Sequence, residues 1–123
     1  MSDEILKAAH YNHHPSGVEC IEVTRWLSNN RGNAFKYIFR RDHKAQGIKD
    51  LRKALYYVRD EIKYKVNFGV INKYGMEAIT KICNHTLVKW ERDCYWCLAN
   101  GDLLSLRLCE QHLKEAIDQY DAS

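Results

Sequence analysis

The sequence predicts an all-α fold, a single domain of about five helices that ends in an antiparallel helical hairpin. Apolar residues recur three or four positions apart in several segments, and no segment alternates polar and apolar residues as a half-buried β-strand does. The chain has 123 residues, 46% of them hydrophobic, and one proline. This length and composition are typical of one folded domain and exclude an intrinsically disordered chain.

The N-terminal part predicts an arm followed by a helix. Residues 1–15 are rich in histidine and are expected to form an irregular arm, with His13 and His14 in solvent. Ser16-Gly17-Val18-Glu19 matches a capping box, in which the first side chain caps the helix and the fourth reaches back. We therefore expect a helix over 16–28 that ends at Asn29-Asn30-Arg31-Gly32.

Two further helices are predicted before residue 65. One follows Gly32 directly and carries several cations, and the polar residues 42–47 then indicate a break. The other helix has the clearest helical period in the chain. Its apolar positions are Ile48, Leu51, Leu55, Val58 and Ile62.

The C-terminal part predicts the helical hairpin, over 76–120. Glycines and asparagines in 67–75 indicate a loop or hinge. A long helix is expected over 76–99, and Asn100-Gly101 is typical of a helix C-cap followed by a turn. Asp102 should cap the last helix, and so short a connection places consecutive helices side by side in opposite directions.

The charge of the chain is small overall and uneven. The net charge is +3, but residues 31–65 hold eleven Lys and Arg against four Asp and Glu, a local balance of +7. A basic segment in a nearly neutral protein indicates a local anionic ligand more than a long nucleic-acid track. Nucleic-acid binding is the less favoured alternative, which the aromatic residues among the cations would serve by stacking on bases: Trp26, Tyr37, Tyr56 and Tyr57.

The sequence also predicts a cytoplasmic protein with no membrane partner. No apolar run reaches the length of about 18 residues that a membrane span needs, and the first residues lack the apolar core of a signal peptide. The five cysteines are therefore expected to be reduced thiols.

The predicted basic helix places polar donors on one face. Asn33, Lys36, Tyr37, Arg40 and Lys44 fall within about 100° of arc, and apolar residues fall on the other side. An amide, a phenol and three cations in one row can bind an anion with several oxygens, and phosphate is the first candidate. The alternative is an ordinary solvated basic face.

The next helix carries a second polar strip of Asp50, Lys53 and Tyr57. Asp50 could orient Lys53 or hold Arg40 in place, and surface ion pairing is the plainer explanation. The chain has no Gly-x-x-x-x-Gly-Lys-Ser/Thr loop, so any phosphate chemistry here cannot use a P-loop.

The cysteines leave one metal question open. Cys94, Cys97, Cys109 and His112 have the spacing of a zinc quartet. In a hairpin that turns near Gly101, Cys109 can reach Cys94, but His112 lies a turn too far from Cys97. Buried cysteines in a helical core explain the same pattern without zinc.

Four motifs occur in order over about residues 9–62. They are His10-Tyr11-Asn12, then Gly17 to Val23, then Gly32 to Arg40 with Lys44, then Asp50 to Val58. Together they resemble a small bacteriophage family known as domain of unknown function 3310, which includes a phage nucleotide kinase. The resemblance implies a phage protein that acts on nucleotides in the host cytoplasm, without a P-loop and as a homo-oligomer.

The resemblance also implies roles for individual residues. His10 and Glu19 would be catalytic and would activate the acceptor of a phosphoryl group, and Asp50 would orient its neighbours. No metal-binding residue is assigned, and Mg²⁺ carried by the nucleotide is the one cofactor to consider. The residues implied to bind the nucleotide are Tyr11, Asn33, Lys36, Tyr37, Arg40, Lys44, Lys53 and Tyr57.

Three functions are open at this point. The first is a nucleotide kinase-like phosphotransferase that acts on deoxynucleoside phosphates. The second is a non-catalytic protein that sequesters nucleotides, including signalling nucleotides of host defence. The third is a small inhibitor that binds a host factor through its helical hairpin.

Overall fold

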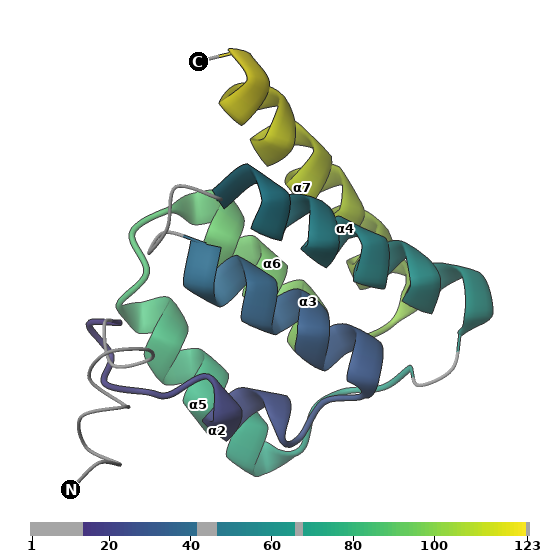
Figure 1. The fold of residues 1–123 in the computed structure, drawn as a ribbon. Helices are drawn as coiled ribbons and strands as arrows, with labels where there is room; N and C mark the ends of the chain where they lie inside the picture. Colours follow the sequence, from purple (N-terminus) through teal and green to yellow (C-terminus); the bar gives the residue numbers. More distant parts are fainter. Residues whose placement is uncertain (1–13, 42–46, 66–67, 123) are drawn as a thin grey trace, which may run out of the picture.

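The computed structural model describes residues 14–41, 47–65 and 68–122, and this part of the chain folds into helices joined by short connections (Figure 1). No strand occurs in the described ranges, so the predicted all-α class is confirmed. The six helices found there are α2 (Ile21–Thr24), α3 (Asn29–Arg40), α4 (Gly47–Tyr64), α5 (Lys73–Asn84), α6 (Lys89–Asn100) and α7 (Leu103–Ala122).

Helices α3 and α4 pack against each other, and each also contacts other helices. They lie side by side and run in opposite directions (Figure 1). Helix α4 also contacts α7, helix α6 contacts α3 and α7, and α5 contacts α2 and α6. Most residues predicted to bind a ligand lie on the α3–α4 pair.

Both central helices bury the apolar side that the sequence predicts. Burial of one large apolar side chain stabilises a fold by roughly 1.5–3 kcal/mol, so the two stripes determine how α3 and α4 face each other. The buried residues of the stripes are Ala34, Phe35, Ile38, Phe39, Leu51, Leu55 and Val58, with Ile48 and Ile62 half-buried at the ends.

The first helix is much shorter than the predicted 16–28. The Ser16 hydroxyl accepts from the Val18 N–H at 3.1 Å, which closes a turn around Gly17 (φ +76°) instead of capping a helix. The reach-back contact occurs three residues later, where the Glu22 carboxylate accepts from the Glu19 N–H at 2.7 Å. Helix α2 therefore spans only Ile21–Thr24.

The predicted stop at Asn29-Asn30-Arg31-Gly32 is also wrong, because these residues form the first turn of α3. Ser28 has the extended backbone of an N-cap (φ −65°, ψ 168°). Its carbonyl accepts from the Gly32 N–H at 2.7 Å, which is the first bond of the helix. The break expected over 42–47 falls largely outside the described residues, and α4 begins at Gly47.

The long helix predicted over 76–99 is divided into α5 and α6. The Thr86 hydroxyl bonds to the Ile82 carbonyl at 2.6 Å and so occupies the end of α5. Arg92 then donates to the carbonyls of Thr86 and Leu87 at 2.8 and 3.1 Å, which fixes the connection outside a helix. Helix α5 begins earlier than expected because the Asn72 side chain caps it by accepting from the Gly75 N–H at 3.0 Å.

The predicted C-terminal hairpin is formed by α6 and α7. Gly101 adopts the left-handed backbone of a C-cap (φ +65°), and the Asp102 carboxylate accepts from the Ser105 N–H at 2.7 Å. This bond lowers the pKa of the exposed Asp102. Leu98, Leu106 and Leu113 are fully buried in the core. No helix in the described part of the chain is long and apolar enough to cross a membrane.

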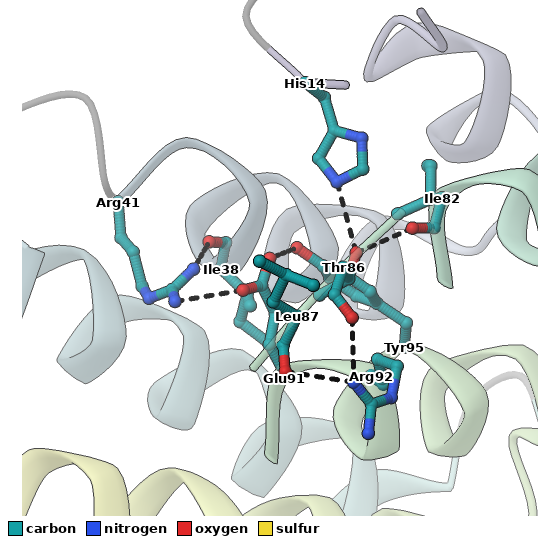
Figure 2. Close-up of polar contacts among 9 residues, drawn as sticks. All are labelled: His14, Ile38, Arg41, Ile82, Thr86, Leu87, Glu91, Arg92 and Tyr95. Atoms are coloured by element: carbon teal, nitrogen blue, oxygen red, sulfur yellow. Dashed lines mark hydrogen bonds and ion pairs between the residues drawn. The ribbon is translucent and has the colours of Figure 1, made fainter. Parts of the chain in front are cut away.

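Two buried arginines join α3 to α6. Arg31 donates through Nε to the Leu98 carbonyl at 2.9 Å and through Nη2 to the Ala99 carbonyl at 3.1 Å. Arg41, directly after α3, donates to the Glu91 carboxylate at 3.0 Å and to the Ile38 carbonyl at 2.9 Å (Figure 2). Glu91 also accepts from the Tyr95 hydroxyl, so both of its oxygens are bound within the core.

Candidate anion-binding site

Three cations from α3 and α4 converge on one aromatic ring. Lys36 Nζ, Arg40 Cζ and Lys53 Nζ lie 5.0, 4.9 and 5.2 Å from the centre of the Tyr37 ring. Lys36 and Arg40 come from α3, whereas Lys53 comes from α4, so the packing of the two helices creates the site. Each distance is within the range of a cation–π interaction.

A second tyrosine completes the aromatic part of the site. The rings of Tyr37 and Tyr57 are nearly parallel, at 6° to each other, with centres 6.1 Å apart. Tyr56 meets Tyr57 edge to face at 5.3 Å. Three tyrosine rings therefore form a continuous series from α3 to the outer side of α4.

The buried carboxylate of Asp50 pairs with one of the three cations, Arg40. Arg40 Nη2 lies 3.7 Å from Asp50 Oδ1, and the carboxylate is buried while the Arg40 side chain is partly exposed. Asp50 Oδ2 and Arg40 Nε are buried and have no hydrogen-bond partner among the described residues. Of the two roles the sequence allows for Asp50, this geometry favours holding Arg40. We define the Tyr37 cluster as Lys36, Tyr37, Arg40, Asp50, Lys53 and Tyr57.

The segment before α2 borders the cluster. Burial raises the pKa of the Cys20 thiol to about 11, and the nearby charges of Lys36 and Arg40 oppose this increase. Cys20 thus lies within electrostatic reach of two cations of the site. Glu19 precedes it in the chain and is half-buried.

Asn33 is not part of the group at the ring. Asn33 uses its amide to donate to the Asn29 carbonyl at 2.9 Å, one turn earlier in α3. His10, Tyr11 and Lys44 lie outside the described residues.

The expectation of a solvated His14 is wrong. Its ring stacks on Phe39 with centres 5.2 Å apart. Its nitrogens lie 2.8 Å from the Ser16 hydroxyl and 3.1 Å from the Thr86 hydroxyl, so His14 ties the start of the described chain to the end of α5 (Figure 2). His13 lies outside the described residues.

The C-terminal cysteines belong to the core. Cys94, Cys97 and Cys109 are buried, and Cys109 contacts Cys94 as the hairpin geometry predicts. A hydrogen bond with Cys94, together with burial, raises the pKa of Cys109. Within the described ranges, no group of three or more His, Cys, Asp or Glu side chains could hold a metal ion.

Sequence reasoning missed how the two polar strips meet. It placed Lys36 and Arg40 on one helix and Lys53 and Tyr57 on another, with no basis for their relative register. The sequence held only an indirect signal for this meeting. Each polar strip lies beside an apolar stripe on its helix, and when the two apolar stripes pack against each other, the polar strips beside them also meet.

Comparison with known proteins places the cluster within one family match. Residues 5–59 match a family described as protein of unknown function, DUF3310, in agreement with the motifs. The match covers α2, α3 and most of α4, and therefore every member of the Tyr37 cluster. No curated protein and no solved structure matches the chain.

Proposed function

We propose that this chain binds a nucleotide on the Tyr37 cluster. The observation that carries the proposal is the convergence of Lys36, Arg40 and Lys53 on one tyrosine ring.

The cations favour a ligand with more than one negative charge. Three like charges around one ring repel each other, and Asp50 is the carboxylate that pairs with one of them. A phosphate carries several oxygens that accept charge-assisted hydrogen bonds, from a guanidinium in a planar fork and from lysines as point charges. Binding a phosphate would therefore relieve the repulsion.

The tyrosines favour a ligand that also has an aromatic part. Tyr37 and Tyr57 are half-buried and nearly parallel, and Tyr56 beside them is exposed. Any nucleobase can stack on such rings, because every base has a flat aromatic face and stacking does not depend on its hydrogen-bond donors and acceptors. A nucleotide supplies both the phosphate and the aromatic part in one molecule.

Phosphoryl transfer is the activity that we propose for the bound nucleotide, on the basis of the family resemblance. Lys36 and Arg40 would neutralise the charge on the transferred group, and Glu19 or His10 would activate the acceptor hydroxyl. Mg²⁺ would enter with the nucleotide. A phage protein that acts in the host cytoplasm, as a homo-oligomer, fits the same proposal.

A thermal-shift screen with product analysis tests the proposal. The protein would be heated with nucleoside mono-, di- and triphosphates and cyclic dinucleotides, each with and without Mg²⁺. Stabilisation with a new phosphorylated product is the expected result. Stabilisation with the ligand recovered unchanged would identify a sequestering protein, and no shift with any nucleotide would contradict the proposal.

Glu19→Gln separates catalysis from binding. In a phosphotransferase this change should abolish turnover and leave nucleotide affinity nearly intact, because the amide keeps the size of the side chain but cannot take a proton. Turnover equal to that of the wild type would remove Glu19 from the mechanism.

A further inference from the structure

A second candidate surface lies on the outer side of α4, where it meets α7. A groove of about 640 Å³ is open there, with Leu55 and Ile117 at its base. Tyr56 and Tyr64 stand on its walls, and both are more than half exposed, at 65% and 59%. We call this feature the α4–α7 groove.

The exposed charge of α4 is almost entirely positive. Its carboxylates Asp50 and Glu61 are buried on the inner side, and Asp60 is half-buried. The cations on the outer side are all exposed: Lys49, Arg52, Lys53, Arg59 and Lys63. Arg52, Arg59 and Lys63 line the groove itself, together with the half-buried Asp60.

Two of these cations have carboxylate partners that a stronger anion could replace. Arg52 lies 3.4 Å from Asp121 and Arg59 lies 2.9 Å from Glu110, both on α7. The Arg52 pair is more than half exposed on both sides. Exposed pairs of this kind contribute little to stability, so their cations are available to a phosphate backbone.

We propose that the α4–α7 groove binds single-stranded nucleic acid. The tyrosines supply platforms for bases, and the cations between them supply contacts to the backbone. Tyr56 and Tyr64 are eight positions apart on the helix, which corresponds to about 12 Å at the α-helical rise. That separation is too large for the two rings to clamp one base, so each ring takes a different base and the ligand is an oligonucleotide.

The groove is continuous with the Tyr37 cluster but does not depend on it. Tyr56 lines the groove and touches Tyr57, which is stacked on Tyr37. A strand in the groove could therefore extend toward the cluster. The inference goes beyond the proposed nucleotide site, because Lys63 and Tyr64 are outside the cluster and outside the residues that match the family.

Fluorescence anisotropy with labelled oligonucleotides tests the inference. The probes are single strands of about 12 nucleotides, one of DNA and one of RNA, which tells the two sources apart. The wild-type protein should bind at least one of them at low salt, with an affinity that falls steeply between about 50 and 200 mM salt.

The chain offers a closely matched control. Lys63 lies 5.1 Å above the Tyr64 ring, and Lys73 lies 5.3 Å above the Tyr74 ring on α5, where Tyr74 is 56% exposed. Tyr64→Ala and Lys63→Ala should each weaken oligonucleotide binding by at least about fivefold. Tyr74→Ala and Lys73→Ala should leave it unchanged.

The outcomes separate this inference from the nucleotide proposal. Tyr64→Ala should retain the thermal shift that mononucleotides cause in the wild type. If the wild-type protein binds oligonucleotides but shows no thermal shift with mononucleotides, the result supports the groove and contradicts the nucleotide proposal. Absence of binding at low salt would overturn the inference, as would equal losses in the Tyr64 and Tyr74 variants. Displacement of the oligonucleotide by poly-glutamate as effectively as by unlabelled strand would overturn it too, and would indicate an acidic protein partner.

Discussion

At the residue scale, the attractive and repulsive free energies of the contacts at Tyr37 nearly cancel in the absence of a ligand. An exposed cation gains about 0.5–1 kcal/mol from an aromatic face. Repulsion between neighbouring cations in water-like surroundings has a similar size. The Tyr37 cluster therefore stabilises the fold little by itself, and an anion that binds all three cations changes the balance.

The lysines of the cluster give the first prediction. Lys36→Ala and Lys53→Ala should each weaken binding of the stabilising nucleotide by about 1–3 kcal/mol, because each removes a charged donor. Calorimetric titration measures the change. Lys81→Ala is the control, since Lys81 is an exposed lysine on α5, away from the cluster. Equal affinities in wild type and both cluster variants would show that the ligand binds elsewhere.

Cys20 gives a prediction about pH. Burial raises the pKa of its thiol from 9.0 to about 11. Below pH 9 the thiol is protonated in both the folded and the unfolded chain, so it adds no pH dependence. Between pH 9 and 11 the unfolded chain loses this proton first, so the free energy of unfolding falls as the pH rises.

Urea unfolding at a series of pH values measures this effect. The wild type should lose more stability than Cys20→Ala between pH 9 and 11. The comparison removes the contribution of other groups that titrate in the same range. Parallel pH profiles for the two proteins would contradict the burial of this thiol.

The spacing of the apolar residues and the residue types typical of helix ends predicted some helices well and others poorly. The stripe from Ile48 to Ile62 predicted α4, because burial of one side of a helix sets the spacing of its apolar residues. Ser16 misled, since a serine followed by glycine can close a local turn as easily as it caps a helix. The division between α5 and α6 depends on Thr86 and Arg92, whose contacts with backbone carbonyls exist only in the folded chain.

At the element scale, Gly101 determines how the hairpin meets α3. A Cβ atom at this position would lie 2.4 Å from Arg31 Cζ and 2.5 Å from the Gly69 carbonyl oxygen. Contacts so short cannot persist, and the Arg31 guanidinium would lose its place on the carbonyls that end α6. The close approach, and not only the left-handed backbone, requires glycine here.

Gly101→Ala and Gly17→Ala form a matched pair that tests this point. Both glycines have left-handed backbone, but a Cβ at Gly17 meets nothing within 4 Å. Gly17→Ala should cost about 1–2 kcal/mol for the backbone alone. Gly101→Ala should cost clearly more, as measured by chemical denaturation, and equal costs would contradict the close contact with Arg31.

At the scale of the whole molecule, buried charge joins the family-matching part to the C-terminal helices. Residues 5–59 match the family, whereas Glu91 and Tyr95 lie beyond them on α6. Arg41 and Glu91 are 3.0 Å apart and more than nine-tenths buried. The Trp90 ring lies 4.7 Å from the Arg41 guanidinium, within the range of a cation–π interaction.

Glu91→Ala should destabilise the protein by about 3–5 kcal/mol, because it leaves the Arg41 charge buried without this partner. Asp93→Ala is the control on the same helix. Asp93 pairs with the exposed Lys89 at 2.7 Å, and the loss of such a surface pair should cost less than about 1 kcal/mol. Denaturant titrations compare the two variants, and similar losses would show that the buried pair has no special weight.

The sequence predicted the residues of the candidate site better than their arrangement. Lys36, Tyr37 and Arg40 could be placed on one face because helical spacing determines it. Their meeting with Lys53 depends on the register between α3 and α4, which is set by the packing of both apolar stripes. Self-association stays a prediction, for which the exposed apolar side chains Val70, Leu87 and Leu104 are the first surfaces to examine.

A two-dimensional NMR titration tests directly whether a nucleotide binds on the Tyr37 cluster. The labelled protein would be titrated with the nucleotide that stabilises it. Amide shifts should change mainly in α3 around Lys36–Arg40 and in α4 around Lys53–Tyr57. Changes confined to α5, α6 or α7, or no changes at saturating nucleotide, would contradict binding on the cluster.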